Sequence, residues 1–141
     1  MNRVDYTLEA ARLVMRILEL PGLIGEVKRQ MTALRAERRE LERWMEAREA
    51  QAYLEVPGKT ERERQARTRV LLAQDLEWQK AEKRLQQILT QLDKLQAELE
   101  VLEHERKAVY GALVARHAEA LEAALAAGLF GAKPPAPRGG N

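Results

Sequence analysis

The sequence contains no cysteine, only 4% aromatic residues, and no apolar run near the ~20 residues of a membrane span. Without cysteine the chain can form neither a disulfide nor a cysteine metal site, which fits a reducing cytoplasm. So few aromatic residues argue against a thick globular core. The N-terminus lacks the apolar segment of a signal peptide. We therefore expect a cytoplasmic protein that does not engage a membrane.

Charged residues make up 33% of the chain and hydrophobic residues 45%, with leucine, alanine, glutamate, arginine and glutamine dominant. This composition is typical of long helices and coiled coils. The net charge is only +2, but residues 28–69 hold 12 basic and 8 acidic residues, whereas residues 93–122 hold 4 and 7. Such asymmetry indicates an anionic partner for the middle of the chain.

Apolar residues recur at alternating spacings of three and four in two long stretches. The first stretch consists of Tyr6, Ala10, Leu13, Ile17, Leu20, Ile24, Val27, Met31, Leu34, Leu41 and Met45. The second consists of Leu71, Trp78, Ala81, Leu85, Ile88, Leu92, Leu95, Leu99, Leu102, Val109 and Leu113. This heptad pattern predicts two helices that pack along a narrow seam. Between the stretches, Pro57-Gly58 is a strong signal for a turn. The sequence therefore predicts an all-α fold, a long antiparallel coiled-coil helical hairpin.

The expected helical domain spans residues 1–128, and signals for helix starts and stops divide it. Pro21 is expected to kink or break the first leg, and both outcomes remain open. Thr60 and Glu63 form a capping box that starts the second leg. Gly128 is expected to end a short C-terminal helical extension. The predicted parts are leg one over 2–54, a turn over 55–59, leg two over 60–127, and a disordered proline- and glycine-rich tail over 129–141.

The first leg also carries apolar residues that lie off the heptad seam. A two-helix hairpin leaves such a face exposed, and exposed apolar patches usually mark a partner. We predict that the chain forms a homo-oligomer through this face; the alternative is that the C-terminal helix folds back over it. The predicted oligomer interface consists of Leu8, Val14, Met15, Leu18 and Leu23.

Arginines occupy inward heptad positions near the turn, where leucine or isoleucine would be expected. Antiparallel pairing places Arg48 opposite Arg67, and like charges that face each other are destabilising. Arginine binds phosphate bidentately, and aromatic rings stack on the bases of single strands. Two interpretations stay open: nucleic-acid binding at the tip, or neutralisation of the arginines by neighbouring glutamates. The predicted nucleic-acid-binding residues are Arg43, Arg48, Tyr53, Lys59, Arg62, Arg64, Arg67 and Arg69.

No catalytic or metal constellation emerges from the sequence. Gly58-Lys59-Thr60 matches the end of a phosphate-binding loop, but Tyr53 stands where that motif requires glycine. His104 and His117 are too far apart for a helical metal pair. No nucleophile or carboxylate pair stands in a recognisable pocket. We therefore predict no enzyme activity, no cofactor and no metal.

The run from Tyr53 to Gly58 and the later run Arg69-Val70-Leu71-Leu72-Ala73-Gln74-Asp75 carry a family resemblance. Over roughly residues 40–125 the chain resembles the UvsY-type recombination mediators of tailed phages. It is also similar to short phage coiled-coil proteins encoded beside single-strand-annealing genes.

The resemblance implies an oligomer of helical hairpins, commonly a ring, that binds single-stranded DNA. Such a ring helps to load a RecA-like recombinase against a single-strand-binding protein. Its DNA-contacting basic residues lie just before the hairpin tip, where Arg48 is the nearest match and Arg43 lies one turn back. Ala50 stands where a second basic residue is expected.

The sequence is compatible with two functions. The first is a phage DNA-recombination accessory protein of the host cell cytoplasm, with single-stranded DNA and a recombinase or annealing protein as partners. The second is a coiled-coil scaffold, or a modulator of a host protein such as RNA polymerase, that binds no nucleic acid.

Overall fold

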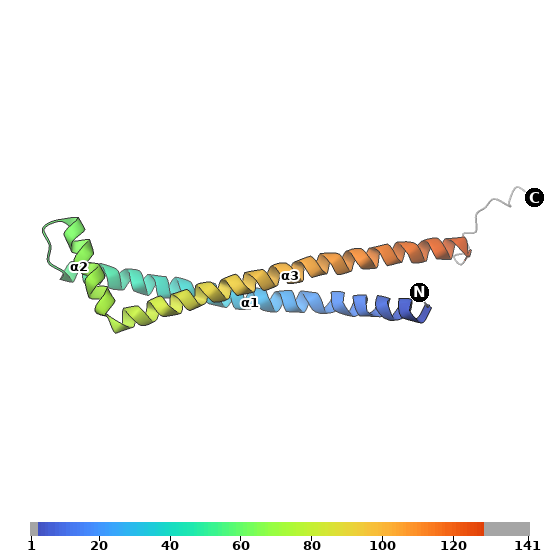
Figure 1. The fold of residues 1–141 in the computed structure, drawn as a ribbon, viewed down its shortest axis with the longest axis horizontal. Coiled ribbons are helices and arrows are strands. Elements are labelled where there is room, and N and C mark those ends of the chain that lie inside the picture. Colours follow the sequence, from blue (N-terminus) through green and yellow to red (C-terminus); the bar gives the residue numbers. More distant parts are fainter. Residues whose placement is uncertain (1–2, 129–141) are drawn as a thin grey trace, which may run out of the picture. The chain divides into compact units, whose positions relative to one another are not determined.

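The computed structural model describes the backbone of residues 3–128 and the side chains of residues 9–128. The predicted tail, residues 129–141, lies outside these. Within the described part the chain is helical and contains no strand, so the all-α prediction is confirmed. Across the same residues, no helix combines the length and apolar character that a bilayer crossing requires. The helices are α1 (Arg3–Glu55), α2 (Glu61–Gln74) and α3 (Leu76–Ala126) (Figure 1).

Packing divides the chain into two compact units. Unit 1 comprises Met1–Ile24 and Glu100–Asn141, and unit 2 comprises Gly25–Leu99. Unit 1 therefore holds the start of α1 and the end of α3, whereas unit 2 holds the rest of both helices and all of α2. The predicted oligomer face lies in unit 1, and the predicted nucleic-acid site lies in unit 2.

The core of unit 1 is small and apolar. Leu20 is fully buried, and Ile24 and Leu102 are almost so. All three are predicted seam positions, and they are buried because the heptad positions of α1 and α3 face each other. At the end of α3, Gly128 adopts a left-handed conformation with φ 71°, and its amide donates to the Leu125 carbonyl at 3.1 Å. The predicted glycine cap is therefore confirmed.

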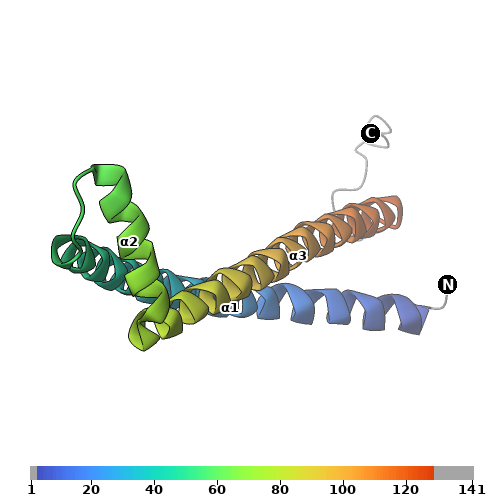
Figure 2. The same ribbon diagram turned by 60° about the vertical axis from the view of Figure 1, so that its left-hand side comes forward.

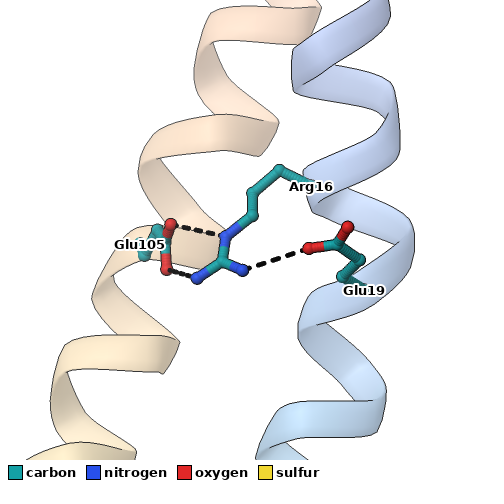
Figure 3. Close-up of polar contacts among 3 residues, drawn as sticks. All are labelled: Arg16, Glu19 and Glu105. Carbon is teal, nitrogen blue, oxygen red and sulfur yellow. Dashed lines mark hydrogen bonds and ion pairs between the residues drawn. The ribbon is translucent and has the colours of Figure 1, made fainter.

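Ion pairs join the two helices of unit 1. Arg16 Nε lies 2.7 Å from Glu105 Oε1, and the same guanidinium reaches Glu19 at 3.2 Å (Figure 3). Hydrogen bonding from Arg16 lowers the pKa of the Glu105 carboxyl. A second pair joins Glu9 to Arg116 at 2.6 Å. Because residue numbers rise along α1 while those of the partners fall along α3, the contacts follow the order that a hairpin requires.

Pro21 lies inside α1 without interrupting it. Proline removes one helical hydrogen bond, and its ring crowds the carbonyl four residues earlier. The adjacent Leu20 and Ile24 are buried in the core, and this burial offsets the cost. The alternative of a broken first leg is therefore wrong, whereas a kink at Pro21 stays a prediction.

In unit 2, most buried apolar residues of the two long helices lie at predicted seam positions. The seam is flanked by a bidentate ion pair in which Arg84 donates two hydrogen bonds of 2.8 Å to Glu37. This pair joins α3 to α1 across the edge of the apolar core. The buried residues of this seam are Val27 and Met31 on α1, with Ala81, Ile88 and Leu99 on α3; Ala52, near the end of α1, is also buried and packs in the core of the tip.

The chain turns at residues 56–60 between α1 and α2, one residue later than predicted (Figure 2). Thr60 caps α2, because its hydroxyl accepts a hydrogen bond from the Glu63 amide at 3.2 Å. The Glu63 carboxylate accepts one from the Lys59 amide at 3.3 Å. The capping box is therefore present, with its return bond made to Lys59 rather than to Thr60 itself.

Replacing Thr60 with alanine should cost about 1 kcal/mol of stability, because the cap of α2 is lost. Urea unfolding followed by circular dichroism measures the change. Thr90→Ala is the matched control: the Thr90 hydroxyl bonds only to the Gln86 carbonyl of its own helix, and alanine is the better helix former. Equal losses for the two variants would contradict the capping role.

Asp75 separates α2 from α3, where the sequence predicts one continuous leg over residues 60–127. Its amide donates to the Leu72 carbonyl at 3.0 Å and closes α2 with a tight last turn. Its Oδ1 accepts hydrogen bonds from the amides of Glu77 at 3.0 Å and Trp78 at 3.4 Å, which caps α3. The second leg is thus two helices, and the chain changes direction between them (Figures 1 and 2).

The break at Asp75 accompanies a shift of the buried face of α2 by one residue. The predicted seam passes through Leu71, but Leu71 is 39% exposed and Leu72 only 5%. Thr68 and Ala52 complete this part of the core. The Thr68 hydroxyl donates to the Arg64 carbonyl at 2.7 Å, so its burial leaves no polar group unpaired.

Candidate nucleic-acid interface

Arg64 of α2 is enclosed by the turn. Its Nη2 donates to the Tyr53 carbonyl at 2.9 Å, and its guanidinium carbon lies 4.4 Å from the centroid of the Tyr53 ring. A Cβ added at Gly58 would lie 2.5 Å from Arg64 Cγ, so the turn packs directly on this side chain. Arg64 Nε is buried without a hydrogen-bond partner among the described residues. Arg64 and one face of the Tyr53 ring therefore serve the packing of the tip.

Arg67 and Arg48 also make contacts inside unit 2. Arg67 Nη1 donates to the Pro57 carbonyl at 2.9 Å, and Nη2 lies 2.9 Å from Glu63. Arg48 Nε donates to Asp75 Oδ2 at 2.7 Å. The predicted facing pair of Arg48 and Arg67 is thus replaced by separate contacts, because a carbonyl and two carboxylates lie within reach of these long side chains.

The remaining cations of the predicted site have no internal partner. Their side chains are exposed and form no ion pair or hydrogen bond within the described part of the chain. The structure therefore divides the predicted site into residues that hold the tip together and residues that face solvent. The second group, the free tip cations, consists of Arg43, Lys59, Arg62 and Arg69.

The ion pair between Arg48 and Asp75 ties α1 to the junction of α2 and α3. Hydrogen bonding from Arg48 lowers the pKa of the Asp75 carboxyl below its ordinary value of 3.8. The same contact raises the pKa of the Arg48 guanidinium. Because Asp75 also caps α3, one carboxylate fixes both the helix start and the position of α1 beside it.

Asp75→Asn should lower the thermal midpoint by a few degrees at neutral pH, because asparagine keeps the cap but loses the ion pair. Since the folded-state pKa of Asp75 lies below the unfolded value, the stabilisation is present above that unfolded value and disappears as pH falls through the folded one. Wild type and variant should therefore converge at acid pH. Asp93→Asn in α3 is the control variant. A difference in thermal midpoint between wild type and Asp75→Asn that does not change with pH would contradict this account.

Unit 1 exposes apolar side chains from both of its helices. On α1, Val14, Met15, Leu18 and Leu23 are exposed, Leu18 by 74%, whereas the side chain of Leu8 lies outside the described ones. The oligomer interface itself stays a prediction. On α3 a further set at helical spacing is exposed, and none of its members belongs to the predicted interface. This set consists of Tyr110, Val114, Leu121 and Leu125.

Among the described residues, no three histidine, aspartate or glutamate side chains come together in a group that could hold a metal ion.

No known family model matches the sequence, and comparisons with curated proteins and with solved structures also find no match.

Proposed function

We propose that the chain is a non-catalytic accessory protein of phage DNA recombination, an antiparallel coiled-coil hairpin that binds single-stranded DNA through unit 2. The free tip cations carry this proposal, because they are exposed and make no internal ion pair in the described part of the chain. Guanidinium and ammonium groups without partners in the fold are available to phosphate. Bound to a strand in the host cytoplasm, the protein assists the loading of a recombinase or annealing protein.

Binding of this kind is driven by phosphates and not by base sequence. Contacts to phosphate position a protein on a strand but carry no sequence information directly. Counterion release makes such binding steeply dependent on salt. Self-association through the exposed apolar faces of unit 1 would place several such cation sets on one strand and raise the overall affinity.

Fluorescence anisotropy with labelled single-stranded and duplex oligonucleotides of equal length tests the proposal. At low salt we expect the protein to bind both, with the single strand bound more tightly because it can bend to follow the cations. The absence of binding at micromolar protein would contradict the proposal.

The second candidate function is a protein-interaction scaffold without nucleic-acid binding. Its support is the exposure of Met15 and Leu18 on α1 and of Tyr110 on α3, by 63, 74 and 64%. Apolar surface of this kind usually marks a contact with another protein. This candidate requires no affinity for either oligonucleotide and a defined protein partner in an affinity capture from the source cells.

A further inference from the structure

Three arginines follow one another at intervals of four residues along the part of α1 that belongs to unit 2. Arg35, Arg39 and Arg43 therefore lie on one face of the helix, about 6 Å apart along its axis. All three are exposed, and none forms an ion pair or hydrogen bond within the described residues. We call these residues the arginine stripe; only Arg43 also belongs to the predicted tip site.

The stripe differs from the other charges in this part of α1. Arginines four residues apart repel each other and destabilise a helix. Neighbouring arginines avoid this penalty through pairs with glutamate, whereas two exposed glutamates without such a pair among the described residues, Glu40 and Glu46, each lie three residues from Arg43. The neighbouring pairs are Arg29–Glu26 at 2.8 Å, Arg38–Glu42 at 2.7 Å and Arg84–Glu37 at 2.6 Å.

We infer that the arginine stripe is a further contact segment for nucleic acid, which carries a single strand along α1 beyond the tip. The inference rests on the proposed function. Cations at regular intervals along a helix match the repeating charges of a phosphate backbone, whereas a small anion would require donors that converge on one point. A bound single strand of nucleic acid would also supply the negative charges with which these three arginines form no pair in the described part of the fold.

Trp44, which follows Arg43, supports this assignment. Trp44 is 38% exposed, although the Arg48 guanidinium, which pairs with Asp75, lies over its ring with the guanidinium carbon 5.6 Å from the ring centroid. An aromatic ring beside phosphate-binding cations is the arrangement on which bases of a single strand stack without sequence preference. The stripe and Trp44 together offer both the phosphate and the base contacts that single-strand binding uses.

The double variant Arg35→Gln/Arg39→Gln tests the inference and leaves all four free tip cations in place. With a labelled single-stranded oligonucleotide, we expect its affinity to fall at least about fivefold at moderate salt. The slope of log K against log salt should become less steep by about 1.4, or about 0.7 for each lost contact to a single strand. Helix content should be unchanged or higher, because two like-charge neighbours are removed.

Lys83→Gln/Lys94→Gln is the matched control, since it removes two exposed positive charges from α3 of the same unit. We expect this variant to bind almost as the wild type does. If the arginine variant binds like the wild type, or if both variants weaken equally, the stripe makes no specific contact and the inference is overturned. If the wild type itself fails to bind, the proposed function falls, and the inference falls with it.

Discussion

Leu72→Ala is expected to lower the free energy of unfolding by about 2–5 kcal/mol. Leu72 is 5% exposed and packs in the small core that α2 shares with the end of α1. Truncation would lose its apolar contacts and leave a cavity that a narrow core cannot close. Because total stabilities are about 5–15 kcal/mol, the loss should be obvious in urea unfolding followed by circular dichroism.

Leu71→Ala is the matched control, one residue away in the same helix. Leu71 is 39% exposed, so its truncation should cost about 1 kcal/mol or less. The continuous heptad seam inferred from the sequence requires the reverse order, because it passes through Leu71. A larger loss for Leu71→Ala would therefore contradict the packing of α2 described above.

Replacing the four free tip cations by glutamine is expected to weaken single-strand binding by roughly two orders of magnitude at moderate salt. The salt slope should become less steep by about 3, because four phosphate contacts are lost. All four side chains are exposed, so the fold should persist with unchanged helix content. Anisotropy over a salt series measures both effects.

A control with the same change in net charge takes four lysines from α3. It consists of Lys80→Gln, Lys83→Gln, Lys94→Gln and Lys107→Gln. A comparable loss of affinity in this control would show that binding depends on total charge and not on the tip. Wild-type affinity in the tip variant would show that the tip cations do not contact DNA.

The seam of the long helices could be predicted from sequence because burial there follows the heptad period. Leu20 and Ile88, the two fully buried large side chains, are both predicted seam residues. Capping signals at Thr60 and Gly128 were also predictable, since each acts through local hydrogen bonds.

The junction at Asp75 could not be predicted in the same way. The apolar period continues through it, so periodicity alone indicates one helix. The competing signal is an aspartate that caps the amides of Glu77 and Trp78 while it pairs with Arg48. That partner is remote in sequence, and its position depends on the packed fold. The helix therefore breaks at Asp75 because of a tertiary contact that the local sequence pattern does not reveal.

The candidate site was predictable in composition but not in detail. The sequence places arginines at inward positions near the turn; Arg64 is half-buried there, whereas the side chain of Arg67 is 48% exposed. Their acceptors include the carbonyls of Tyr53 and Pro57, and backbone groups leave no trace in a side-chain pattern. The cations that stay unpaired can be recognised only after the paired ones are known.

The salt dependence of single-strand binding by the wild-type chain tests the central claim most directly. Anisotropy titrations between about 50 and 200 mM salt give the slope of log K against log salt. The free tip cations together with Arg35 and Arg39 predict a slope of about −4, from about 0.7 for each of these cations. An oligonucleotide that does not bind at low salt, or an affinity that does not change across the series, would contradict the account.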